Sequence, residues 1–319
     1  MEKMKVFIAD SIAKEGMEEF GKFPGLELTV KTGLAADRLI AELGDAAALV
    51  VRSATQATRE LMGAGKKLRV IGRAGAGVDN IDVKAAGERG IVVLNTPGGN
   101  AEAAAELAVA MMFALARDLA RADASMKAGK WDKKSFSGAE LLGKTLGLVG
   151  IGNVGRIVGK SALALGMKVM AYDPFVTAEA ASAMGFRAGS FEEVLRGSDY
   201  VSIHSPRTEK TEGLFNLKSF AFMKKGSFLV NCARGGIVVE KDLVAALDAG
   251  MLQGAGVDVF EREPPEDWSL AKHPRVIATP HLGATTAEAQ VNVSVMIARQ
   301  IGAYLTRGEI INAVAAPGA

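Results

Sequence analysis

A glycine-rich turn between two apolar runs constrains the fold of this chain more than any other feature. Gly150, Gly152 and Gly155 stand in G-x-G-x-x-G spacing after an apolar run. An amphipathic segment, residues 156–165, follows them and leads to a second apolar run at 168–172. This order predicts a strand, a tight turn, a helix and a parallel strand, which is the unit of doubly wound α/β sheets.

The same turn predicts a dinucleotide site. The first glycine allows the tight turn, the second lets the backbone approach a pyrophosphate, and the third permits close contact between strand and helix. The helix N-terminus then offers free N–H groups to the phosphates. Asp173 lies 18 residues past Gly155 (173 − 155 = 18), where its carboxylate can accept bonds from ribose hydroxyls and repel a 2′-phosphate. We therefore expect NAD rather than NADP. A turn without ligand and a methyltransferase are the alternatives.

The rest of the chain predicts two α/β lobes. At 319 residues the chain is long enough for about two domains of roughly 150 residues each. Short apolar runs alternate with helical patterns, which is typical of parallel sheets wrapped by helices. We expect strands in the two lobes at 5–9, 26–30, 48–51, 69–71 and 91–94, and then at 145–149, 168–172, 200–203, 227–230, 255–259 and 276–278.

Two helical segments decide how the lobes are connected. Residues 101–127 contain no Gly or Pro and predict one long helix, followed by an irregular connector at 129–143. This helix is either a core helix joining the lobes or one that also meets its copy in a dimer. A last helix, at about 286–306, follows the second set of strands and can return to the first lobe. We expect one domain from 1–99 with 287–319, and the other from 100–286.

Composition excludes several classes of protein. Apolar residues make up 49% and charged residues 23%, which is typical of a globular protein and unlike disordered or collagen-like chains. The net charge is +2 and no basic run exceeds two residues, which argues against nucleic acid or an anionic membrane as partner. The single cysteine, Cys232, cannot form an internal disulfide. No signal-peptide core is visible, so we expect a soluble cytoplasmic protein.

Three loops of the second lobe carry polar residues where strands end, at the edge where ligands bind in open α/β sheets. Among the three histidines, His281 is the candidate acid/base, since oxidation of a hydroxyl-bearing carbon requires removal of a proton. Glu263 can orient its imidazole, and Arg234 offers a planar fork for a carboxylate. His273 is expected to be a solvated surface residue, and His204 a structural group near the cofactor. Cys232 is interpreted as a packing residue beside the cofactor.

A second glycine turn, residues 72–80, also follows a strand but lacks the third glycine. Its exposed N–H groups can cradle a small anion. A purely structural turn is the other interpretation.

At these residues the chain resembles the D-2-hydroxyacid dehydrogenase family over essentially its whole length. The motifs that carry the resemblance are residues 51–55, 72–82, 95–97, the Gly150 turn, 230–236, 256–260, 263–265 and 280–283. Val239-Glu240 departs from the Asp-Glu pair that relatives often have after Gly-Ile-Val. The resemblance implies a Rossmann-type doubly wound sheet and a smaller flavodoxin-like α/β domain built from both termini.

The resemblance also implies roles for residues. Arg234, Glu263 and His281 would be the catalytic set, with Arg234 and His281 also binding substrate. The residues implied in NAD binding are Gly150, Gly152, Asn153, Val154, Gly155, Asp173, Ser205, Cys232, Ala233, Asp258 and Gly283. Those implied around the substrate's anionic groups are Arg52, Arg73, Ala74, Gly75, Ala76 and Gly77. Lys133 or Lys134 of a dimer partner would reach a phosphate, and the 101–128 region would form the dimer or tetramer contact. No metal is expected.

The activity implied first is NAD-dependent oxidation of D-3-phosphoglycerate to 3-phosphohydroxypyruvate, because Arg52 and Arg73 favour a doubly anionic substrate. Another D-2-hydroxy acid, or reduction of hydroxypyruvate or glyoxylate, is the alternative. An NAD-sensing interaction protein on the same fold is a third. Because the chain ends near residue 319, we expect no C-terminal regulatory domain and no feedback control through one.

Overall fold

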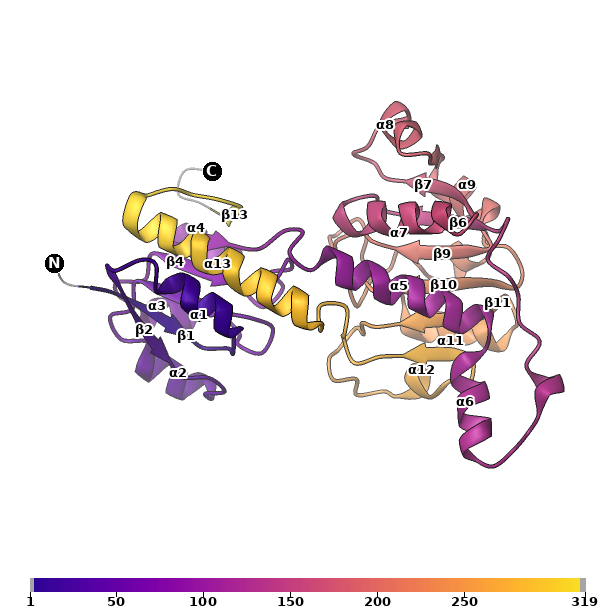
Figure 1. Cartoon of the computed structure of the whole chain (residues 1–319), viewed down its shortest axis with the longest axis horizontal. Coiled ribbons are helices and arrows are strands. Elements are labelled where there is room, and N and C mark those ends of the chain that lie inside the picture. Colours follow the sequence, from indigo (N-terminus) through magenta and orange to yellow (C-terminus); the bar gives the residue numbers. More distant parts are fainter. Residues whose placement is uncertain (1–2, 316–319) are drawn as a thin grey trace. The chain divides into compact units, whose positions relative to one another are not determined.

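The computed structural model describes residues 3–315, and the chain divides into two compact units. Unit 1 contains the residues up to Asn100 together with those from Ala284 onward, and unit 2 is the continuous segment Ala101–Gly283. In Figure 1 the indigo beginning and the yellow end of the chain both belong to unit 1. The expected boundaries, 99/100 and 286/287, lie one and three residues from these.

Unit 1 is built on a six-stranded sheet in the order β13-β5-β4-β3-β1-β2. Its strands are β1 (Met4–Ile8), β2 (Leu26–Val30), β3 (Ala48–Val51), β4 (Val70–Arg73), β5 (Val92–Leu94) and β13 (Ala313–Ala315). The first five run parallel in the flavodoxin-like order, and β13 adds to β5 in antiparallel register. The expected flavodoxin-like α/β fold of this unit is confirmed.

Helices cover both faces of this sheet. They are α1 (Lys14–Phe20), α2 (Ala36–Leu43), α3 (Arg59–Ala64), α4 (Val83–Glu88) and α13 (Ala287–Arg307). Helices α2, α3 and α4 bury apolar side chains on one face, and α1 and α13 cover the other. Helix α13 begins at Thr286, whose hydroxyl accepts a bond from the Ala289 N–H, and ends at Gly308. The return of this last helix to the first lobe is confirmed.

Unit 2 contains a seven-stranded parallel sheet in the order β12-β11-β10-β9-β6-β7-β8. Its strands are β6 (Thr145–Val149), β7 (Lys168–Tyr172), β8 (Arg187–Ala188), β9 (Tyr200–Ile203), β10 (Ser227–Asn231), β11 (Leu252–Val257) and β12 (Val276–Ala278). The order reverses between β6 and β9, as in the Rossmann fold. The expected doubly wound sheet is confirmed.

Helices also form a layer on each face of this second sheet. The helices of unit 2 are α5 (Ala101–Ala116), α6 (Leu119–Lys127), α7 (Asn153–Ala164), α8 (Ala178–Ala183), α9 (Phe191–Gly197), α10 (Leu217–Phe220), α11 (Glu240–Asp248) and α12 (Ser269–Lys272). Helices α5, α7 and α8 contribute to one apolar core, and α9 to α12 contribute to the other. Because both faces are covered, the carboxyl ends of the strands are where loops can present polar groups.

The prediction of one helix over 101–127 is wrong. The helix ends at Ala116, and α6 begins at Leu119 after Asp118 adopts a left-handed conformation with φ 51°. A continuous α-helix cannot contain that conformation, but aspartate tolerates it better than most residues. Helix α5 is buried against the sheet and α7, whereas α6 has no buried residue.

The short strands β8 and β13 were not predicted, because two or three residues are too few to show an alternating pattern. None of the helices between residues 3 and 315 has the length and apolarity that crossing a bilayer requires.

Candidate active site

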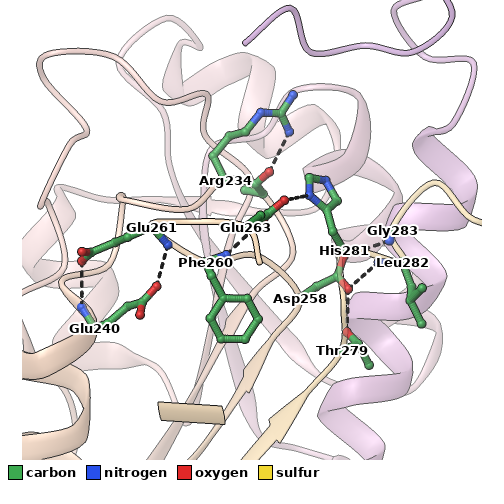
Figure 2. A network of polar contacts seen from close by, with 11 residues as sticks. Arg234, Glu240, Asp258, Phe260, Glu261, Glu263, Thr279, His281, Leu282 and Gly283 are labelled. Atoms are coloured by element: carbon green, nitrogen blue, oxygen red, sulfur yellow. Dashed lines mark hydrogen bonds and ion pairs between the residues drawn. The ribbon is translucent and has the colours of Figure 1, made fainter. Parts of the chain in front are cut away.

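Three consecutive parallel strands of unit 2 bring the predicted catalytic residues to one edge of the sheet. Arg234 follows β10, Glu263 follows β11 and His281 follows β12. Adjacent parallel strands end at the same edge, so loops about 20 to 30 residues apart in sequence meet there. Figure 2 shows the three side chains gathered at this edge.

His281 and Glu263 form a close hydrogen-bonded pair. Their Nδ1 and Oε2 atoms are 2.6 Å apart, and the two side chains are 44% and 37% exposed. An ionised carboxylate only accepts, so Nδ1 carries the hydrogen and Nε2 is left for another partner. The hydrogen bond with Glu263 raises the pKa of His281, although burial and the Arg234 charge oppose it. This arrangement is that of an acid/base histidine oriented by a carboxylate.

Glu263 is held in place from its own turn. Its Oε1 atom accepts a bond from the Phe260 N–H at 3.1 Å. Burial alone would raise the pKa of Glu263. The hydrogen bond and charge of His281, the Phe260 N–H and the Arg234 charge together hold this pKa below its ordinary value. Glu263 is therefore charged at neutral pH.

Asp258 fixes the loop that carries His281. It is fully buried, and its carboxylate accepts bonds from the Thr279 hydroxyl at 2.5 Å, the Leu282 N–H at 2.7 Å and the Gly283 N–H at 2.8 Å. Its backbone carbonyl accepts from the His281 N–H at 2.9 Å. These bonds hold His281 in a left-handed conformation with φ 54°, which costs about 1 kcal/mol or more for a residue other than glycine. Direct contact of Asp258 with NAD stays a prediction.

The Arg234 loop is anchored by Asn231. The Asn231 side chain donates to the Arg234 carbonyl and accepts from the Ala233 N–H, both at 3.1 Å. The Arg234 guanidinium donates to the Ala233 carbonyl at 2.7 Å. It also lies close enough to Glu263 and His281 to lower the pKa of both.

The other two histidines and the cysteine are not placed for proton transfer. His204 is half-buried with its Nδ1 enclosed, burial lowers its pKa to about 4, and its Nε2 lies 2.9 Å from the Ser202 hydroxyl. His273 was expected to be solvated, but its side chain is only 9% exposed and pairs with Asp248 at 3.3 Å. That expectation is wrong, because the ring also accepts a bond from the Arg275 N–H at 3.1 Å and is held between these two partners. Burial raises the pKa of the Cys232 thiol, which therefore stays protonated.

The glycine turn after β6 has the geometry of a cradle. A Cβ on Gly155 would lie 2.2 Å from the Gly150 carbonyl oxygen, so only glycine allows this close contact. A Cβ on Gly152 would meet nothing within 4 Å, so open space lies over the start of α7. Asn153 and Val154 form the first turn of that helix. The turn can therefore receive a pyrophosphate as predicted.

Polar groups from β7 and β9 flank the glycine turn. The Asp173 carboxylate, just after β7, accepts from the N–H groups of Ile151 and Phe175, both at 2.9 Å. A carboxylate has about four acceptor positions, so Asp173 retains capacity for ribose hydroxyls. The Ser205 hydroxyl, just after β9, donates to the Val149 carbonyl at 3.0 Å.

Unit 1 presents its own arginines at the carboxyl ends of β3 and β4. Arg52 follows β3, and its buried Nε has no hydrogen-bond partner among residues 3–315. Burial lowers the pKa of Arg52, and Asp10 opposes that shift. Arg73 ends β4, and a Cβ on Gly75 would lie 1.9 Å from its guanidinium. The turn at 74–77 is thus shaped around Arg73, while its role in anion binding stays a prediction.

Sequence reasoning missed the residues that hold these groups. The Asp10 carboxylate accepts from the N–H groups of Arg52 and Thr55 and from the Thr55 hydroxyl. The Asn80 amide donates to the carbonyls of Arg52 and Thr55. Asp10 lies two residues after the end of β1. A search for polar residues near the carboxyl ends of the predicted strands would therefore have found it.

Comparisons with known proteins show the family of the chain. Residues 109–283, just over half of the chain, match the family described as "D-isomer specific 2-hydroxyacid dehydrogenase, NAD binding domain". Relatives named D-3-phosphoglycerate dehydrogenase include one from Archaeoglobus fulgidus, 48% identical over 93% of this chain and 56% of its own length. One from Bacillus subtilis is 41% identical over 98% of this chain and 59% of its own length. The chain thus spans little more than half the length of these curated relatives.

Solved structures match the chain over nearly its whole length. A glyoxylate reductase from Paecilomyes thermophila has a TM-score of 0.89 at 29% identity, over 98% of this chain and 99% of that one. An NAD⁺-bound 3-phosphoglycerate dehydrogenase of Entamoeba histolytica has a TM-score of 0.83 at 30% identity, over 99% of both chains. With the family match and the site geometry, these similarities show that the chain belongs to the D-isomer specific 2-hydroxyacid dehydrogenases and contains their NAD-binding domain.

Proposed function

We propose that this protein oxidises D-3-phosphoglycerate to 3-phosphohydroxypyruvate with NAD, the first step of L-serine biosynthesis. The observation that carries the proposal is the 2.6 Å pair of His281 and Glu263 beside Arg234. The relatives named D-3-phosphoglycerate dehydrogenase support the choice of substrate.

His281 acts as the base in this direction. Nδ1 is bonded to Glu263, so Nε2 takes the proton of the substrate's C2 hydroxyl as C2 gives up its hydride. The imidazolium that forms is stabilised by the Glu263 carboxylate. In the reverse direction the same nitrogen returns the proton to the keto oxygen. The elevated pKa of His281 favours this protonated state.

Arg234 binds the substrate carboxylate through its planar fork and polarises the reacting oxygen. Its positive charge opposes protonation of His281, while the Glu263 charge favours it. The net result is a pKa of His281 above its ordinary value, so the imidazolium that forms during oxidation is favoured.

The residues of the glycine turn fit NAD. The space over Gly152 and the free N–H groups of Asn153 and Val154 would hold the pyrophosphate, and Asp173 would hold the adenosine ribose. Cys232, Ala233 and Gly283 lie in the loops after β10 and β12, on the nicotinamide side. When bound, NAD accepts the hydride from C2.

Unit 1 carries basic groups of its own that suit a phosphorylated substrate. Arg52 is half-buried with a free Nε–H among the described residues, and the turn at 74–77 lies beside Arg73. The N–H groups of Ala74 and Gly75 donate to the carbonyls of Val51 and Arg73, so those of Ala76 and Gly77 would bind the anion. Two arginines suit a substrate with two anionic groups better than glycerate or lactate, each of which has only its carboxylate. Another 2-hydroxy acid remains the second candidate, because Arg234, Glu263 and His281 serve every substrate of this class.

A panel of substrates tests the proposal. NADH formation is followed by absorbance with NAD or NADP and D-3-phosphoglycerate, D-glycerate and D-lactate. We expect the highest kcat/KM with NAD and D-3-phosphoglycerate. Clear turnover of glycerate or lactate without turnover of 3-phosphoglycerate would refute the substrate. Tight NAD binding with no turnover of any hydroxy acid would favour an NAD-sensing interaction protein.

We also propose a homodimer and a cytoplasmic location. Helix α6 and the connector after it expose Leu119 (52%), Met126 (54%) and Trp131 (83%), an apolar surface suited to a second copy. Lys133 and Lys134 lie in a 3₁₀ turn of that connector. Within the expected contact region 101–128, α5 exposes Phe113 (39%) and α6 has no buried residue, and the connector 129–143 adds to this exposed apolar surface. Light scattering of the wild type and of Leu119→Asp measures the oligomeric state and so tests the dimer. Fractionation of cells tests the cytoplasmic location.

A further inference from the structure

Two glutamates outside the catalytic set join the loops that carry it. The Glu261 N–H donates to Glu240 Oε1 at 2.5 Å, and the Glu240 N–H donates to Glu261 Oε1 at 3.1 Å. Each side chain thus binds the other residue's backbone, as Figure 2 shows. We call this pair the glutamate clasp.

The clasp lies between the Arg234 and Glu263 segments. Glu240 lies six residues after Arg234, at the end of the loop between β10 and α11, and Glu261 lies two residues before Glu263. The two backbones touch directly, since a Cβ on Gly235 would lie 1.7 Å from the Phe260 carbonyl oxygen. The N–H of Phe260 in turn binds Glu263. The clasp and this backbone contact thus join the segment that carries Arg234 to the turn that carries Glu263.

Two carboxylates this close repel one another, so the clasp needs a compensating charge. Helix α11 begins at Glu240, and its N-cap residue Val239 offers no side-chain acceptor. Glu261 supplies that acceptor from a different segment, and the positive end of the helix dipole favours both carboxylates. Burial raises the pKa of Glu240. The Glu261 N–H opposes this rise, and the charges of Glu261 and Asp267 add to it.

We propose that Glu240 and Glu261 are positioning residues, which set the placement of Arg234 against Glu263 and His281. This inference rests on the proposed function, because it assigns the clasp to the same reaction. The side chains of the clasp bind backbone groups and each other's segment, so they act through Arg234 and Glu263.

Glu261→Ala tests the clasp, because it removes the acceptor for the Glu240 N–H. Glu261→Gln is the rescue, since an amide oxygen can still accept that bond. Glu193→Ala is the matched control. Glu193 accepts a bond from the Ser190 N–H at 2.7 Å at the start of α9, which carries none of the site residues. Steady-state kcat and KM, the Kd of NAD and the melting temperature are measured for all four proteins.

We expect Glu261→Ala to lower kcat/KM for the hydroxy acid by about 10- to 100-fold through both a lower kcat and a higher KM, as misplaced catalytic groups do. The Kd of NAD should stay within twofold, and Glu261→Gln should recover most of the activity. Glu193→Ala should lower the melting temperature by about as much as Glu261→Ala does, but should leave kcat unchanged. If Glu261→Ala behaves like Glu193→Ala in kcat and KM, the clasp is only structural and the inference is wrong.

Two provisions keep the test decisive. If Glu261→Ala does not fold, Glu261→Asp replaces it, because this variant retains the charge but shortens the side chain by one methylene. A smaller decrease in kcat and a smaller increase in KM are then expected. If wild type turns over glycerate or lactate rather than 3-phosphoglycerate, the proposed substrate fails, and the variants are compared on the better substrate. Turnover of no hydroxy acid by wild type refutes the proposed function and this inference together.

Discussion

The pair of His281 and Glu263 makes Glu263→Gln the most informative single substitution. The variant keeps the shape of the side chain and removes its charge. A hydrogen bond to a charged group contributes about 1.5–3 kcal/mol. The two side chains are 44% and 37% exposed, so solvent screening reduces this to about 1–2 kcal/mol. If the whole of this is lost when the imidazolium forms, kcat for oxidation falls roughly 5- to 30-fold.

The pH profile separates this electrostatic effect from a general loss of structure. Oxidation needs neutral His281, so kcat/KM rises with pH through the pKa of that residue. Glu263 raises this pKa, and its neutral replacement should move the acid limb of the profile to lower pH. Reduction needs protonated His281, so its alkaline limb should move to lower pH as well.

Profiles of kcat/KM are measured in both directions for wild type, Glu263→Gln and the control Glu266→Gln. Glu266 is an exposed carboxylate near Glu263 that pairs with Arg262. The control should retain the wild-type profile. An acid limb at the same pH in wild type and Glu263→Gln would refute the reasoning, because it would mean that Glu263 does not set the pKa of His281.

Further predictions concern the glycine turn, the ribose site and the clasp. Gly152→Ala should leave the melting temperature unchanged but raise the Kd of NAD at least about tenfold, since its methyl would enter the space proposed for the pyrophosphate. Gly155→Ala should instead lower the free energy of unfolding by about 1–3 kcal/mol in denaturant titrations, because its Cβ would collide with the Gly150 carbonyl. Asp173→Ala should reduce the ratio of kcat/KM with NAD to that with NADP, and an unchanged ratio would mean that another group reads the ribose. The pKa of Glu240 is raised on folding, so its contribution to stability is lost as pH rises through that pKa. Glu240→Gln should therefore gain stability relative to wild type between pH 4 and pH 8, and a constant difference in melting temperature would contradict this.

Much of the fold follows from local patterns in the sequence. Strands with continuous apolar runs, such as β3 and β9, lie within a residue of the predicted positions, because each is long enough to show its burial. The break at Asp118 was missed, since helix propensity summed over 101–127 outweighs one residue in a left-handed conformation. The burial of His273 depends on its contact with Asp248, which lies 25 residues earlier in the chain, and no local pattern encodes that contact.

The residues of the candidate site also fall into those that local sequence patterns predicted and those that they did not. His281 and Glu263 were predicted because they follow neighbouring strands, and a histidine and a carboxylate at such positions indicate acid/base chemistry by residue type alone. Asp10 and the glutamate clasp were missed because they act on backbone N–H groups. Such bonds depend on the path of two loops and leave no periodic or compositional signal.

The division of unit 1 between the two ends of the chain has a consequence for synthesis on the ribosome. Helix α13 covers the sheet face formed by residues such as Val6, Ile8 and Val70, together with α1. About 200 residues separate β5 from the end of α13, so at about 5–20 residues per second the unfinished sheet waits roughly 10–40 s for its cover. Unit 2 is continuous and can complete its core in that interval. Unit 1 therefore exposes an apolar surface while unit 2 is synthesised, and it completes its core only after unit 2 can have completed its own.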